Sequence, residues 1–179
     1  MPSDRDGRAA RRRRRYDRGM RLPGLVVLTL ACLCAAARPA MADATAFLGI
    51  ATTPANRTVK GAAVGIGLLV LGFEFEYATG DEHLADGVPA LTTGMGNVLL
   101  QTPFPVAGLQ FYATAGAGGY RETLAGRQTT SVGLNTGGGV KIAVSGPLRI
   151  RVDYRVFSLR GEALHPTVHR IYTGLNLAF

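Results

Sequence analysis

A two-residue alternation of apolar and polar side chains runs through most of this chain and limits what it can fold into. Leu148, Ile150 and Val152, for example, alternate with Arg149 and Arg151. Successive side chains of a β-strand point to opposite faces, so this period is typical of strands with one apolar and one polar face. Beyond residue 42 the sequence contains no convincing amphipathic helical pattern and no apolar run of membrane-spanning length. The sequence therefore predicts an all-β protein.

Turn residues divide the alternating region into eight strands. Long polar connections are expected at about 52–60, 80–90, 121–130 and 160–166, and short ones near 69–70, 102–105 and 145–147. The expected strands are roughly 44–52, 60–68, 71–79, 91–101, 107–120, 130–144, 148–159 and 167–179. Because long and short connections alternate, we expect an antiparallel up-and-down order. Closing the eight strands into a barrel removes their unpaired edges.

The first 42 residues have the features of an export signal. A basic start at Arg21 precedes an apolar run from Leu22 to Ala37, and Ala40 and Ala42 then have the A-x-A spacing of a signal-peptidase site. We expect cleavage after Ala42, which divides the chain into a leader, 1–42, and a single β-barrel domain, 43–179.

Three alternatives for this leader stay open. Lipidation at Cys32 would also export the protein, and an uncleaved leader would act as an N-terminal anchor. Met20 is an alternative true start, in which case residues 1–19 are not part of the natural product.

The net charge of +8 comes from the leader. Residues 1–42 hold ten basic and three acidic groups, whereas the rest of the chain holds ten basic and nine acidic groups. Nucleic-acid binding needs a concentrated cationic face, so no nucleic-acid partner is expected. Both cysteines, Cys32 and Cys34, also lie in the leader, which excludes a disulfide scaffold and thiol catalysis in the barrel.

No cofactor and no metal site are expected. The acidic group in the second long connection matches no compact metal-binding loop, and its role is more simply solubility. Its members are Asp81, Glu82, His83 and Asp86.

The polar faces of the predicted strands carry eight charged residues, five basic and three acidic. They are Glu74, Glu76, Lys141, Arg149, Arg151, Asp153, Arg155 and Arg170. Glycines share these faces, which would leave a solvated surface bare but make room in a crowded interior. A barrel in lipid turns its apolar face outward and its polar face inward. We therefore predict that these charges form a Glu–Arg network that plugs the lumen, although the alternation does not determine which residues pair.

The signal peptide, the eight alternating strands, the glycine-rich inner faces and the closing segment 172–179 together resemble the small outer-membrane β-barrels of Gram-negative bacteria. Leu175, Leu177 and Phe179 are similar to the C-terminal assembly signal of that family. The resemblance implies an outer-membrane location and a monomer. It also implies contact with outer-membrane lipid and lipopolysaccharide and with the export and barrel-assembly machinery.

The chain departs from this family in having no tryptophan for the interfacial aromatic girdles. Other aromatic residues must then supply them. The candidates are Phe47, Tyr77, Phe104, Phe111, Tyr120 and Tyr154.

The expected function is non-enzymatic: envelope structure, or surface interaction through the long connections. One alternative is a lipid-modifying enzyme similar to lipid A deacylases, with Ser158, Glu162, His165 and His169 as candidate catalytic residues. The His-x-Ser-Asn segment associated with that family is absent. The other alternative is a soluble, lipocalin-like periplasmic barrel that binds an apolar ligand.

Overall fold

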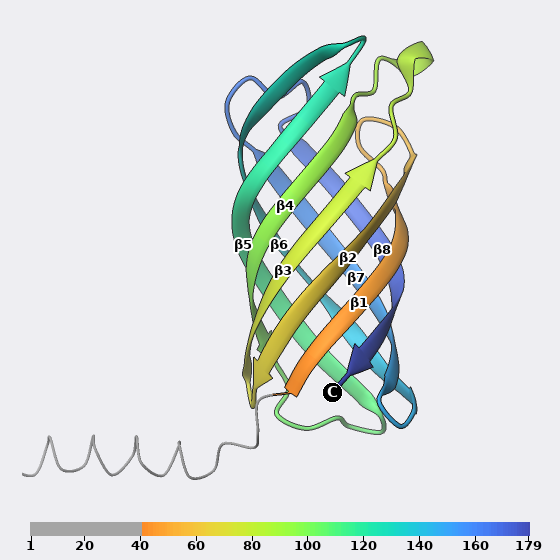
Figure 1. Cartoon of the computed structure of the whole chain (residues 1–179), viewed down its shortest axis with the longest axis vertical. Coiled ribbons are helices and arrows are strands. Elements are labelled where there is room, and N and C mark those ends of the chain that lie inside the picture. The colour runs from red at the N-terminus through yellow and green to blue at the C-terminus, as the bar shows by residue number, and fades with distance from the viewer. Residues whose placement is uncertain (1–40) are drawn as a thin grey trace, which may run out of the picture. The chain divides into compact units, whose positions relative to one another are not determined.

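The computed structural model describes residues 41–179 and places them in one closed antiparallel barrel of eight strands in up-and-down order (Figure 1). The strands are β1 (Met41–Ala51), β2 (Arg57–Leu68), β3 (Leu71–Gly80), β4 (Ala90–Gln101), β5 (Leu109–Leu124), β6 (Arg127–Ser145), β7 (Leu148–Leu159) and β8 (Thr167–Ala178). A short 3-10 helix, η1 (Leu84–Asp86), interrupts the connection between β3 and β4. The predicted fold class is confirmed.

No helix within residues 41–179 is long and apolar enough to cross a membrane.

The first and last strands close the barrel. Their pairing extends from Asp43 opposite Ala178 to Ala51 opposite Arg170. Ala42 continues this seam by exchanging two backbone hydrogen bonds of 2.9 and 2.8 Å with Phe179. Cleavage after Ala42 would remove this last pair. The predictions for Ala40, Cys32 and Met20 lie outside the described residues.

One predicted connection is wrong. The segment 121–130 is not a long loop, because β5 and β6 continue through it and join in a two-residue turn at Ala125 and Gly126. These two residues have φ angles of 49° and 81°. Positive φ at both central positions gives a turn whose twist matches that of the flanking strands, so the hairpin can extend. The polar residues that suggested a loop are paired with one another across β5 and β6. Figure 1 shows these two strands as a long hairpin.

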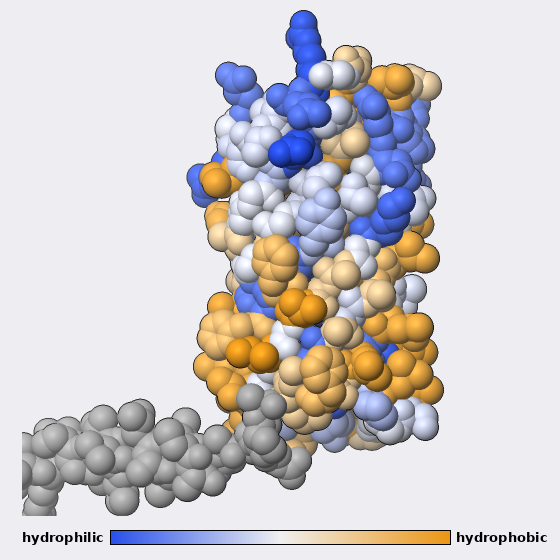
Figure 2. All heavy atoms as spheres, viewed as in Figure 1, coloured by the Kyte–Doolittle hydropathy of each residue, from blue (hydrophilic) through white to orange (hydrophobic). Residues whose placement is uncertain are grey.

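The predicted orientation of the strands is confirmed. Phe73 and Phe75 are 48% and 56% exposed on the outer surface, whereas the side chain of Arg151 is fully buried inside. In the view of Figure 2, apolar side chains gather over the half of the barrel that carries the short turns, and polar side chains gather toward the long connections. The barrel therefore has its apolar surface on the outside and its charged surface on the inside.

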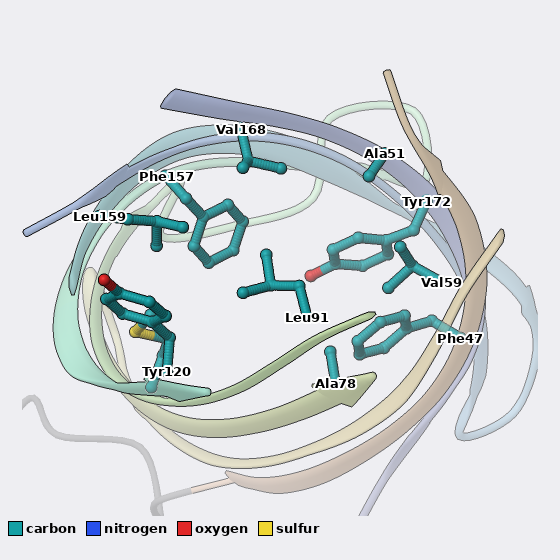
Figure 3. Close-up of a cluster of buried hydrophobic side chains, with 11 residues drawn as sticks. Phe47, Ala51, Val59, Ala78, Leu91, Tyr120, Phe157, Leu159, Val168 and Tyr172 are labelled. Atoms are coloured by element: carbon teal, nitrogen blue, oxygen red, sulfur yellow. The ribbon is translucent and has the colours of Figure 1, made fainter. Parts of the chain in front are cut away.

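The sequence analysis did not predict one feature of the lumen, a cluster of apolar side chains near the long connections. Figure 3 shows Phe157, Leu91 and Tyr172 projecting into the interior, and Ala51, Ala78 and Val168 at the ends of their strands belong to the same cluster. Apolar side chains thus predominate at this end of the lumen, where Arg57 and Glu122 are also buried.

Gly137 lies on the crowded inner wall, and this position generates a first prediction. A Cβ atom added there would meet Tyr154 O and would lie 2.9 Å from the Cα of Arg155. We expect Gly137→Ala to lower the free energy of unfolding by about 1–3 kcal/mol, the usual cost of overpacking. Urea unfolding followed by circular dichroism measures this change.

Gly119→Ala is the matched control, since a Cβ there would meet no atom closer than 4.0 Å. Equal unfolding midpoints for the two variants would contradict the crowded inner wall.

Candidate functional site in the barrel lumen

Three arginines and three carboxylates meet inside the barrel. Glu74 and Glu76 lie two residues apart on β3, so both point inward, and Arg155 of β7 reaches both of them. Arg155 Nη2 lies 2.8 Å from Glu74 Oε1, and its Nη1 lies 3.1 Å from Glu76 Oε2. Arg170 of β8 adds a contact of 2.9 Å from its Nη1 to Glu76 Oε1, and Arg151 Nη1 pairs with Glu74 Oε2.

Asp153 is the third acid of this network and lies between the two arginines of its own strand. Its Oδ2 is 2.8 Å from Arg151 Nη2, and its Oδ1 is 3.1 Å from Arg155 Nε. The six side chains are at most 5% exposed. Because charge-assisted contacts of this kind are strong and the three positive charges match the three negative ones, each buried ion has opposite charges within reach.

Neutral side chains that the sequence analysis did not assign to the network add further hydrogen bonds to it. Tyr172 donates to Glu76 Oε2 at 3.0 Å, and Asn97 donates to Glu74 Oε1 at 3.2 Å. Tyr112 donates to Asp153 and accepts from Arg151 Nε at 2.6 Å. The signal that could have found them is their position, since each lies on the same strand face as other inward residues.

Lys141 and Arg149 have other partners. Lys141 pairs with Asp43 of β1, an acid that the sequence analysis left out, and Arg149 donates to Gln110 Oε1 at 3.3 Å. Arg149 directly follows the first residue of β7, close to the short turn at 146–147. The structure therefore separates these two residues from the six that form the central network.

Polar side chains, two of them buried, also hold the long connections in place. Arg57, which is 3% exposed, donates to the carbonyl of Pro89. Glu122 accepts from the backbone N–H of Leu164 at 3.0 Å, and Glu82 accepts from that of Ala125 at 2.7 Å. These contacts join the connections 81–89 and 160–166 and the β5–β6 turn to the wall.

Two of the six expected interfacial aromatics are inside the barrel, so their assignment is wrong. Phe47 is 4% exposed and stacks on Tyr172 with ring centroids 4.1 Å apart. Tyr120 is 2% exposed and donates to the carbonyl of Arg160 at 2.6 Å. The reason is strand parity, because Tyr120 shares its face with the buried Glu122. The other four lie on the surface: Tyr77, Phe104, Phe111 and Tyr154.

The candidate residues of a hydrolase are not assembled into a triad. Ser158 faces outward at the end of β7, and Glu162 and His165 lie in the connection 160–166. The Nδ1 atom of His169 lies 2.7 Å from the hydroxyl of Tyr154. Within residues 41–179, no hydrogen bond joins Ser158 to a histidine, and no group of three or more His, Cys, Asp or Glu is arranged to hold a metal.

The terminal residues Leu175, Leu177 and Phe179 form an outward row, 60%, 47% and 72% exposed. This row continues the apolar outer surface to the end of the chain.

No family model and no curated protein matches this sequence. Among solved structures, the chain is similar to Neisserial surface protein A, with a TM-score of 0.63 and 18% identity over 80% of this chain and 99% of that one. It is also similar to the N-terminal β-barrel domain of Pseudomonas aeruginosa OprF, with a TM-score of 0.55 and 15% identity over 76% and 97%. The outer-membrane enzyme PagL gives a TM-score of 0.51 and 12% identity over 75% and 98%.

The protein therefore has the fold of the small eight-stranded outer-membrane barrels. At these identities the likeness concerns the fold, and function must be argued from the residues of this chain.

The central network generates a second prediction. Glu76→Gln leaves the charges of Arg155 and Arg170 without one of their buried partners, so we expect a loss of about 3–5 kcal/mol of stability. The double variant Glu76→Gln/Arg170→Gln restores the balance of charge and should recover part of this loss. Denaturant unfolding of the detergent-solubilised protein measures both values.

Glu162→Gln, in the exposed part of the connection 160–166, is the control and should change stability by no more than about 0.5 kcal/mol. If Glu76→Gln proved as mild as this control, the network would not carry the stability assigned to it.

Proposed function

We propose that the protein is an integral β-barrel of the bacterial outer membrane, with a non-enzymatic role in envelope structure or surface interaction and a lumen plugged by its own side chains. The observation that carries this proposal is the orientation of the wall, with Phe75 outward and Arg151 inward. Water would solvate the reverse arrangement better, whereas lipid tolerates this one. The leader, 1–42, would export the chain to that membrane.

The distribution of charge supports a membrane location over the soluble barrel. All five acidic residues of the strands are turned inward: Asp43, Glu74, Glu76, Glu122 and Asp153. Outward apolar side chains occur on every strand, so the apolar band surrounds the barrel. A lipocalin-like barrel needs an apolar cavity, and the middle of this lumen is occupied by ion pairs instead.

Two groups of side chains inside the barrel, the ion network and the apolar cluster, support a plugged lumen. The interior of an eight-stranded barrel is just wide enough for side chains to fill it. The ion network fills the level of Glu74, Glu76 and Arg155, and the apolar cluster around Leu91 and Phe157 fills the end next to the long connections. A permeating ion would have to break the first layer and lose its hydration in the second.

Hydrogen bonds that hold the long connections in place support a modest role in surface interaction. Arg57, Glu82 and Glu122 fix backbone groups in three places, which lowers the entropy that a partner would have to remove on binding. The longest of these connections spans only residues 81–89, so the surface they offer is small. Outer-membrane lipid, lipopolysaccharide and the export and assembly machinery are the proposed partners of a monomer.

The membrane location generates a third prediction. Val64 is 58% exposed in the apolar band of β2, and an arginine there would face hydrocarbon. We expect Val64→Arg to destabilise the inserted barrel by about 2–4 kcal/mol if it lies near the bilayer midplane. Folding into lipid vesicles, followed by the mobility difference between boiled and unboiled samples in gels, measures this loss.

Thr58→Arg is the control, since Thr58 faces outward on the same strand but near its loop end. If the two variants folded equally well, or if the wild-type protein were absent from the membrane fraction, the proposal would fail.

A fourth prediction concerns conduction. Planar-bilayer recordings of the wild-type protein should show no stable steps, because both layers of the lumen block an ion path. A large porin recorded in the same bilayer verifies the method. Large and stable conductance would refute the plugged lumen without affecting the membrane location.

A further inference from the structure

The outer wall is hollowed along β8, β1 and β2. A groove of about 650 Å³ lies there, lined by outward side chains that include Ala46, Leu48, Ile150, Thr173 and Leu175. A second hollow of about 400 Å³ shares Leu48 and Thr173 with the first. The two hollows therefore adjoin at Leu48 and Thr173 on the outer surface, and together they are called the groove.

The groove exists because small residues lie between larger ones. Ala46 of β1 pairs with Ala62 of β2 on one side and with Leu175 of β8 on the other. Ala46 leaves the floor low, while Leu175 and Ile150, which are 60% and 38% exposed, form a wall. Apart from Lys60 and Thr173 the lining of the larger hollow is apolar, which suits a hydrocarbon chain.

The groove changes from apolar to polar along its length. Its second part includes Ile50 and Ile171 and then Thr52 and Asn56, which belong to the connection after β1. An occupant lying along it would thus have an apolar part against β8 and β1 and a polar part toward the loops. This is the polarity of a membrane lipid.

Lys60 is the charged residue of this groove. It lies three positions from the loop end of β2, where the outward residues change from Thr58 to Ala62. Within the described strands, the charged residues that face outward are Lys60 and Arg121, both basic. Of these two, Lys60 lines the groove, and no acidic residue lines it.

We propose that this groove binds one acyl chain of an anionic, phosphate-bearing membrane lipid whose phosphate pairs with the Lys60 ammonium. The inference rests on the proposed membrane location and goes beyond it by assigning a lipid class to one face of the barrel. A hollow of about 490 Å³ on β2, β3 and β4 is also mainly apolar, but no lysine or arginine lines it, so we expect no preference for anionic lipid there.

Native mass spectrometry of the full protein extracted from its membrane tests this site. Three probe lipids with the same acyl chains are added in detergent: phosphatidylglycerol, phosphatidylcholine and diacylglycerol. We expect one phosphatidylglycerol to bind about fivefold more tightly than phosphatidylcholine, the factor that one lysine near an anionic lipid surface supplies. Diacylglycerol, which lacks phosphate, should bind no more tightly than phosphatidylcholine.

Matched variants separate charge from shape. Lys60→Gln should abolish the preference for phosphatidylglycerol, whereas Arg121→Gln, which removes an outward cation from the opposite wall, should preserve it. Ala46→Phe fills the groove and should weaken binding of all three lipids. Ala115→Phe adds the same ring to the outward face of β5 and should not.

Equal loss of preference in Lys60→Gln and Arg121→Gln would overturn the site in favour of diffuse electrostatics. Unchanged binding by Ala46→Phe would overturn the groove as the seat of the chain. A protein that inserts and shows the gel shift, yet has no lipid preference, refutes this inference alone. A protein that never enters the membrane refutes the proposed function as well.

Discussion

Three arginine side chains in this barrel have almost no contact with water, and their charges depend on carboxylates placed within hydrogen-bond distance. Removing a guanidinium group from water costs several kcal/mol, and only good geometry with opposite charges offsets that cost. Arg155 meets this condition through three acids, Glu74, Glu76 and Asp153. The strands that carry these groups must therefore be paired in one register and closed in one ring before the network exists.

The same requirement determines what the outer surface can be. Each strand alternates, so every inward charge has outward neighbours that face the surroundings. On β7, for example, Arg151 and Asp153 point inward and Ile150 and Val152 point outward. Placing the ion pairs inside a closed barrel thus produces an apolar exterior, and an apolar exterior is compatible with lipid. Interior charge and an apolar exterior are two consequences of one pattern.

The sequence was sufficient to predict strand number, closure and the face of most residues, because these depend on a period of two. It was not sufficient for pairing, since a shift of two residues preserves every face and changes every partner. Asp43 was missed as the partner of Lys141 because the first strand was expected to begin at residue 44. Phe47 was misplaced because the pattern of the first strand is weak, and the β5–β6 hairpin was taken for a loop because its residues are polar on both faces.

The apolar cluster at the loop end was missed for a different reason. Leu91, Met95 and Leu99 share the inward face of β4 with Thr93 and Asn97, so this strand is apolar inside as well as outside and its alternation is faint. The cluster has a consequence for the network beneath it. The apolar side chains near the long connections exclude water from the lumen. Because charge–charge attraction is stronger where water is excluded, the cluster strengthens the ion pairs of the network.

A barrel whose interior charges are paired with one another leaves its outer wall and its connections as the surfaces that can meet other molecules. The connections are fastened by Arg57, Glu82 and Glu122, and the wall is hollowed beside Lys60. Both features add a defined shape or charge that the network does not require, since a flat wall and loose loops would close the same barrel. Function in this protein is therefore best sought on its outside.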